Sequence, residues 1–234
     1  MFQIAAHEDK VPVEELYRYC EIAREILTGK HGVGRVIARP FTGIHPFART
    51  PRRHDFSLKP PSKTMLTELK GNGFDVISVG KIVDIFAGEG ITDYMRTVSN
   101  KDGMEKTREL LSHDFNGLCF INLVDFDMLY GHRNDVKGYT DALNEFDRWL
   151  GDFMLLLSDD DLLMITADHG CDPSTPSTDH SREYIPLMIY GKEVKNGVNL
   201  GTRPQFSDIG KTVCDIFGVN ADIKGSSFKS LILK

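Results

Sequence analysis

Apolar residues recur along the chain with two different spacings. From Val13 to Leu27 they follow the spacing of a helix, and Gly29 predicts its end. Further helices are expected over about 102–113, 139–157 and 206–217. Short runs that are apolar at nearly every position alternate with these helices, and they predict strands over 35–39, 74–80, 117–126, 161–167 and 185–191.

Strands of this kind are usually covered on both faces. The order of elements therefore predicts an α/β fold, with a mainly parallel sheet sandwiched by helices. The stretch from Pro40 to Pro61 has neither spacing and is interpreted as a long loop and a candidate domain boundary. Asp102 followed by Glu105 resembles an N-terminal capping box of the second helix.

Composition narrows the classes of function. The 234 residues are 41% hydrophobic with a formal charge of −6, which favours a globular chain and argues against a nucleic-acid binder. The four cysteines are scattered without a C-x-x-C pair, as expected for reduced thiols in the cytoplasm. No apolar run reaches the roughly 20 residues of a membrane span, and no signal peptide is visible, so we expect no membrane partner.

Two of the predicted strands end in acidic and imidazole side chains. Because ligand crevices of such sheets lie at the carboxyl ends of strands, these groups are candidate ligands of a divalent metal ion. Gly170 and Pro173 in the following loop suit a chain that folds back over its strand and returns a third histidine to the crevice. The alternative is that each group caps a strand or faces solvent. The candidate groups are Asp125, Asp127, His132, Asp168, His169 and His180.

Several long motifs resemble a known family. The stretches "NLVDFDMLYGHRND" (122–135), "ITADHGCDPSTPSTDHSREYIPL" (165–187), and "GVGRVIARPF" with "RTPRRHDFSLKPP" (32–61) are similar to the phosphopentomutases of the alkaline-phosphatase-like metalloenzymes. The resemblance implies an alkaline-phosphatase-like core with an inserted α/β cap domain. On this basis residues 1–56 are expected to be the C-terminal part of the cap, and residues 57–234 the C-terminal part of the metal-binding core.

The resemblance also implies two Mn²⁺ ions, although other divalent metals are possible, and glucose 1,6-bisphosphate as activator. One ion is expected on Asp127, His132 and His180, and the other on Asp168 and His169. Asp125 is an alternative to Asp127 as a metal ligand, but we expect it to lie outside the ligand shell. The residues matching the family's contacts to the sugar phosphate are Arg35, Arg49 and Lys81. Arg52 is the alternative to Arg49 at the second of these positions.

The activity implied is that of an isomerase in nucleoside and pentose phosphate metabolism. It interconverts ribose 1-phosphate and ribose 5-phosphate, and the deoxy counterparts, through a phosphothreonine enzyme and a bisphosphate intermediate. The family's first aspartate ligand and its threonine nucleophile have no counterpart here. We therefore expect a fragment that contains no catalytic nucleophile, is inactive alone, and has the missing N-terminal segment as a possible partner.

Two other interpretations of the sequence stay open. The chain could be a non-catalytic metal-binding fragment, which metal analysis and a ribose phosphate assay would distinguish. It could also belong to another alkaline-phosphatase-like mutase or phosphodiesterase, although "DHSREYIP" (179–186) favours the phosphopentomutases.

Overall fold

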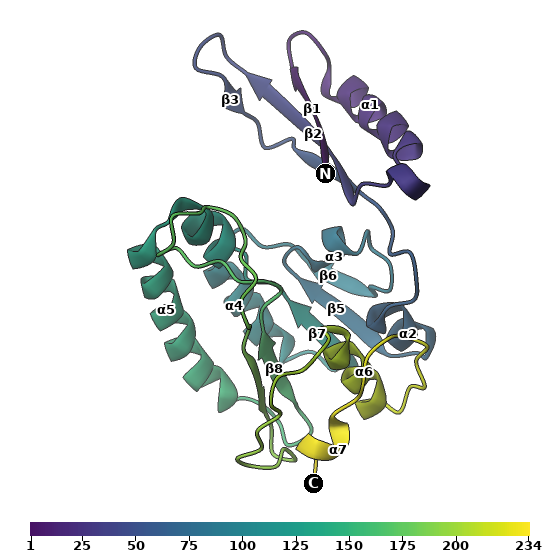
Figure 1. The fold of residues 1–234 in the computed structure, drawn as a ribbon, viewed down its shortest axis with the longest axis vertical. Coiled ribbons are helices and arrows are strands. Elements are labelled where there is room, and N and C mark those ends of the chain that lie inside the picture. The colour runs from purple at the N-terminus through teal and green to yellow at the C-terminus, as the bar shows by residue number, and fades with distance from the viewer. The chain divides into compact units, whose positions relative to one another are not determined.

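The computed structural model describes residues 1–234 and divides them into two compact units. Unit 1 comprises residues 1–62 and 83–89, and unit 2 comprises residues 63–82 and 90–234. Both combine helices with strands, so the expected α/β class is confirmed (Figure 1). The assignment of residues 1–56 to a cap domain and 57–234 to a core domain stays a prediction.

Unit 1 is a four-stranded sheet covered on one face by a helix. Strand β1 is parallel to the central strand β2, while β3 and β4 are antiparallel to it. Leu16 and Cys20 of α1 pack on Val36 and Ala38 of β2, and all four are buried. The elements are β1 (Phe2–His7), α1 (Val13–Ile26), β2 (Arg35–Thr42), β3 (Ala48–Arg49) and β4 (His54–Ser57). The short helix α3 (Ile82–Ile85) also belongs to unit 1, except for its first residue.

Unit 2 is built around a three-stranded parallel sheet with β5 at its centre. Val76 and Val79 of β5 are fully buried, as expected for a strand covered on both faces. The first elements are α2 (Met65–Gly71), β5 (Asp75–Val79), β6 (Asp93–Met95), α4 (Asn100–Leu110) and β7 (Gly117–Ile121).

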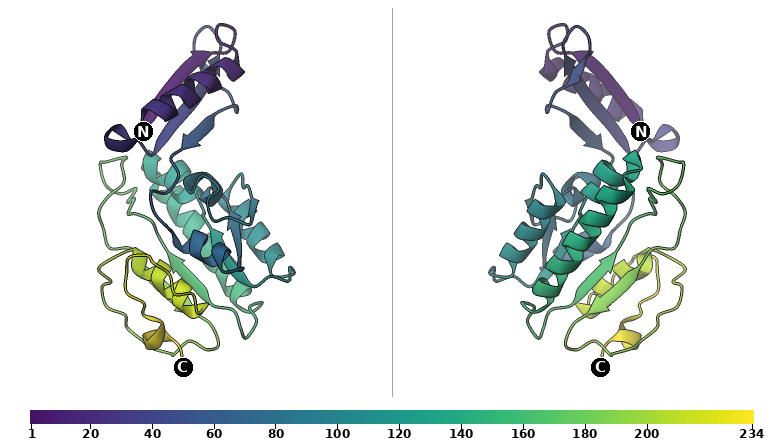
Figure 2. Two further views of the ribbon diagram at one scale, coloured as in Figure 1. Left: turned by 90° about the vertical axis from the view of Figure 1, so that its right-hand side faces the viewer. Right: turned by 90° about the vertical axis from the view of Figure 1, so that its left-hand side faces the viewer.

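The second half of unit 2 begins with two short helical turns after β7. These are the π-helix η2 (Phe126–Tyr130) and the 3₁₀ helix η3 (Gly131–Arg133). The long helix α5 (Val136–Met154), the strand pair β8 (Leu163–Thr166) and β9 (Leu187–Tyr190), and the helices α6 (Ser207–Ile216) and α7 (Lys229–Ile232) follow. Figure 2 shows α6 and α7 together at the C-terminal end of the chain.

Several local features differ from the sequence-based expectations, and one is that β1 (Phe2–His7) precedes the strand at 35–39 that was expected to be the first. Three others concern later segments. First, β8 and β9 are antiparallel, because the chain between them is a loop and contains no crossover helix. Second, the Pro40–Pro61 stretch contains β3 and β4, which are too short to produce an alternating pattern. Third, α4 begins after Ser99, whose hydroxyl accepts from the Asp102 amide, so Asp102 is not its N-cap. None of the helices is long and apolar enough to span a membrane.

Candidate metal centre

One carboxylate and two imidazole rings converge in unit 2. Asp127 lies in η2 and His132 in η3, directly after β7, whereas His180 lies at the far end of the loop that follows β8. Asp127 Oδ1 is 3.2 Å from His132 Nε2 and 3.1 Å from His180 Nε2. One ligand atom from each residue therefore lies within 4.8 Å of the other two.

The loop after β8 folds back on itself and so brings its two ends together. Ser181 N–H donates to the Gly170 carbonyl at 2.8 Å in an isolated antiparallel bridge. The bridge makes His169 and His180 neighbours, and their rings stack with centroids 3.6 Å apart. Asp168 Oδ2 lies 3.6 Å from His169 Nε2. All five candidate ligands thus lie at one end of unit 2, as two adjoining groups.

A hydrogen bond to the Thr178 carbonyl fixes the orientation of the His132 ring. Its Nδ1 lies 2.5 Å from the Thr178 carbonyl oxygen, so it is the protonated nitrogen that donates there. Asn134 Nδ2 donates to the Thr175 carbonyl at 2.5 Å and ties the same two segments together. A histidine that donates through one ring nitrogen keeps the lone pair on the other for a metal ion. His132 Nε2 is the nitrogen that faces Asp127.

The donor set fits a divalent transition metal ion. A carboxylate oxygen and two imidazole nitrogens are ligands that Mn²⁺, Fe²⁺ and Zn²⁺ accept. The side chains of Asp127, His132 and His180 are 32%, 38% and 48% exposed, so solvent or a substrate oxygen can reach the same point. The Asp168 side chain is 74% exposed and lies outside the three-residue group. It is next to this group because it contacts His169, whose ring stacks on His180.

Cys171 belongs to this region, although the sequence pattern did not mark it as a candidate. Burial and then the nearby Asp127 carboxylate raise the pKa of Cys171 above its usual value. A Cβ on Gly131 would lie 2.4 Å from Cys171 Sγ and 3.1 Å from the Phe126 carbonyl oxygen. Only glycine permits this approach.

Lys81 lies beside the π-helix that carries Asp127. Its Nζ contacts Met128 Sδ, one residue after the carboxylate. Gly80 turns the chain from β5 toward Lys81 with a φ of +87°, and a Cβ there would lie 2.5 Å from the Asn122 carbonyl oxygen. The left-handed conformation and the close approach both require glycine.

Arg35 and Arg49 lie in unit 1, on the sheet face opposite α1. Arg35 and Arg39 share that face because they are four residues apart on β2, and Asp55 lies between them on β4. Asp55 accepts two hydrogen bonds of 2.7 Å from Arg53 and lies 3.4 Å from Arg35. Burial and then the nearby Arg53 and Arg49 lower the pKa of Arg39, whose buried Nε has no hydrogen-bond partner. This basic face suits an oxyanion.

Comparison with known families supports a metal-binding role for the chain. A family model described as "Metalloenzyme superfamily" matches residues 26–221. The phosphopentomutase of Lachnoclostridium phytofermentans is 59% identical over 235 residues, covering 100% of this chain and 60% of that protein. The phosphopentomutase of Carboxydothermus hydrogenoformans is 58% identical, with the same two coverages. The chain therefore spans about 60% of the length of these curated relatives.

Two solved structures resemble the fold at low sequence identity. Leishmania mexicana phosphoglycerate mutase is 19% identical with a TM-score of 0.55, over 75% of this chain and 40% of that one. A protein from Pyrococcus horikoshii is 15% identical with a TM-score of 0.53, over 91% of this chain and 66% of that one. At these identities the likeness concerns the fold alone.

The contact between Gly131 and Cys171 can be tested by a double-mutant cycle. Gly131→Ala is expected to lower the free energy of unfolding by about 1–3 kcal/mol, because the added methyl group overpacks a filled space. Cys171→Ala in the same chain should recover part of this loss by removing Sγ. Urea unfolding of the four proteins measures the coupling, and strictly additive effects would show that the two residues do not share this space.

Proposed function

Because the chain belongs to the metalloenzyme superfamily, we propose that the protein carrying these residues is a phosphopentomutase. In this proposal it interconverts ribose 1-phosphate and ribose 5-phosphate, together with the deoxyribose counterparts. The convergence of Asp127, His132 and His180 carries the proposal, since it joins residues from two motifs that are far apart in the sequence. The high identity to two curated phosphopentomutases supports the choice of substrate class.

Two metal ions are proposed, with Mn²⁺ as the metal. Asp127, His132 and His180 would hold one ion, and Asp168 and His169 would contribute to the other. Bound divalent ions supply positive charge that stabilises the oxygens of a transferring phosphoryl group. Around them, the Thr178 carbonyl orients the His132 ring, and the Cys171 thiol lies near Asp127. Glucose 1,6-bisphosphate is the proposed activator.

Arg35, Arg49 and Lys81 are proposed to bind the sugar phosphate. Support comes from the basic face of unit 1, which carries four guanidinium groups and a single carboxylate. A phosphate dianion would reduce the repulsion among them, and arginine presents paired donors to its oxygens. Unit 1 would correspond to part of the cap domain. The four basic residues are Arg35, Arg39, Arg49 and Arg53, and the carboxylate is that of Asp55.

We also propose that the protein works in the cytoplasm. All four cysteines are free, and burial raises the pKa of Cys20 to about 11 and that of Cys119 to about 12. Thiols with such pKa values stay protonated and resist oxidation at neutral pH. They suit a reducing compartment without requiring disulfides for folding.

The activity is tested by phosphorus NMR with ribose 1-phosphate, Mn²⁺ and glucose 1,6-bisphosphate. The same residues within a full-length protein are expected to produce ribose 5-phosphate, and the 234-residue chain alone is expected to produce none. Conversion of 3-phosphoglycerate instead of ribose 1-phosphate would assign the protein to another mutase class. Turnover by the chain alone, or a phosphothreonine found within it by mass spectrometry, would show that it contains its own nucleophile.

The metal assignment predicts a clear difference between two aspartates of the site region. Asp127→Asn should weaken Mn²⁺ binding by more than about tenfold, since even groups outside the ligand shell change metal affinity by about 10–100-fold. Asp179→Asn, in the same loop as His180, is the matched control and should bind Mn²⁺ like the unaltered chain. Isothermal titration calorimetry measures both, and equal affinities would remove Asp127 from the ligand set.

The substrate assignment predicts a change in kinetics without a loss of metal. In the full-length protein, Arg35→Ala or Lys81→Ala should raise KM by about 10–100-fold, as expected for a lost hydrogen bond to a charged group. Lys137→Ala, which removes an exposed lysine paired with Asp141 on α5, is the control. Manganese content is measured in parallel by elemental analysis. A variant that loses manganese would belong to the metal site instead.

A further inference from the structure

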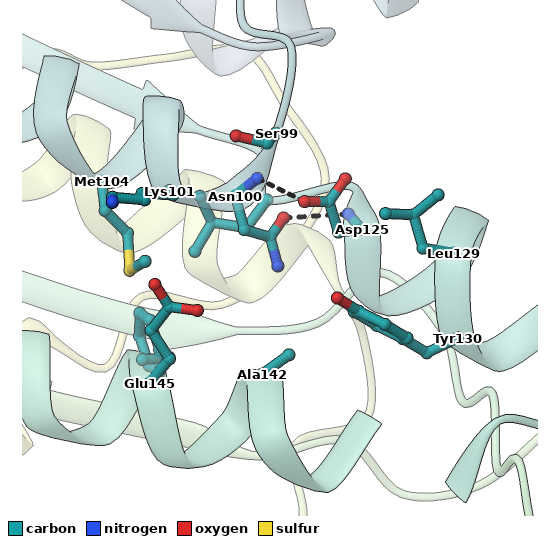
Figure 3. Close-up of a pocket in the computed structure, with 11 residues that line it drawn as sticks. Ser99, Asn100, Lys101, Met104, Asp125, Leu129, Tyr130, Ala142 and Glu145 are labelled. Carbon is teal, nitrogen blue, oxygen red and sulfur yellow. Dashed lines mark hydrogen bonds between the residues drawn. The ribbon is translucent and has the colours of Figure 1, made fainter. Parts of the chain in front are cut away.

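Two reciprocal hydrogen bonds join the start of α4 to the residue that precedes η2. The Asn100 backbone N–H donates to Asp125 Oδ2 at 2.6 Å, and the Asp125 backbone N–H donates to Asn100 Oδ1 at 2.9 Å (Figure 3). Each side chain therefore binds the backbone of the other residue. Asn100 is 7% exposed, so solvent competes little for these bonds.

The position of this pair matters because the chain leaves the sheet there. The Asn122 N–H still donates to the Val79 carbonyl of β5, but Asp125 is the N-cap of η2 and lies two residues before Asp127. The five residues of η2 are thus held at one end by Asn100. At the other end, the Asp135 N–H donates to the Tyr130 carbonyl at 3.0 Å. A shift at either end would move the Asp127 carboxylate relative to the two imidazoles.

We propose that Asn100 and Asp125 form a clamp that positions Asp127 for metal binding. The inference rests on the proposed metal role of Asp127. Asp125 acts here as a positioning residue and not as a ligand: its Oδ2 is occupied by the α4 amide, and no atom of it belongs to the converging group of Asp127, His132 and His180. The clamp supplies what a metal ligand on a short helical turn needs, which is a fixed backbone.

Residue 100 has to accept a hydrogen bond while remaining neutral. A carboxylate there would lie against the Asp125 carboxylate and repel it, whereas an amide oxygen accepts without charge. The amide also has a cost. Asn100 Nδ2 is buried without a hydrogen-bond partner and faces a cavity of about 260 Å³ that is lined by Tyr130, Ala142 and Glu145 (Figure 3). A buried, unpaired donor in a native structure calls for an explanation, and here it accompanies the Oδ1 atom that the clamp requires.

The clamp is tested with variants that break it, keep it or weaken α4 alone. Asn100→Ala removes the side-chain acceptor for the Asp125 backbone N–H, and Asp125→Ala removes the side-chain acceptor for the Asn100 backbone N–H. Asp125→Asn retains an oxygen that can accept and should recover most of what Asp125→Ala loses. Ser99→Ala is the matched control, because it removes the N-cap of α4 and leaves both clamp bonds in place.

The first readout needs no metal. Hydrogen exchange of the 234-residue chain should become faster at residues 126–133 in Asn100→Ala and Asp125→Ala, with little change at β5. Ser99→Ala should speed exchange only in α4. Unchanged exchange at residues 126–133 in Asn100→Ala, or an equal increase there in Ser99→Ala, would overturn the clamp.

The second readout is the Mn²⁺ dissociation constant. Asn100→Ala and Asp125→Ala should raise it about 10–100-fold, the range found for groups that orient metal ligands. If Asp125→Asn loses as much affinity as Asp127→Asn, Asp125 is itself a ligand and the clamp is wrong. If the unaltered chain binds no Mn²⁺, the proposed metal site fails, and the exchange data still decide whether the clamp holds η2.

Discussion

The Asp127 carboxylate is shared by two histidines, and the geometry of the site follows from this contact. His132 Nε2 and His180 Nε2 both lie within 3.2 Å of its Oδ1, although the two histidines come from different segments of unit 2. One carboxylate oxygen cannot satisfy two charged imidazolium rings without leaving them to repel each other. A divalent cation bound among these three side chains would attract the carboxylate and could take one ligand atom from each of them.

The surrounding residues have features that hold these three atoms in place. The Gly170–Ser181 bridge closes the loop that returns His180, and the Thr178 carbonyl fixes which nitrogen of His132 faces inward. Behind Asp127, the Cys171 thiol fits against Gly131 with no room for a methyl group. Contacts of this kind give a metal ligand its direction, and the side chains that bind the ion supply only part of the affinity.

The sequence predicted the α/β class and the candidate ligands, because strand ends and a Gly- and Pro-containing loop are local signals. It did not indicate Asn100 or Cys171. A polar residue at a helix start and a lone cysteine in a loop are ordinary, and only the contact of Asn100 with Asp125 and the contact of Cys171 with Gly131 give them a role. Strands β3 and β4 were missed because strands of two and four residues carry no measurable alternation.

Anomalous diffraction at the manganese edge, from crystals of the chain grown with Mn²⁺, would locate a metal ion bound by Asp127, His132 and His180. If these three residues hold the ion, an anomalous peak is expected within bonding distance of an Asp127 oxygen, His132 Nε2 and His180 Nε2, with His132 Nδ1 still donating to the Thr178 carbonyl; this is the proposed arrangement. An ordered site with no peak among these three atoms, or a metal ion bound through His132 Nδ1, would contradict it.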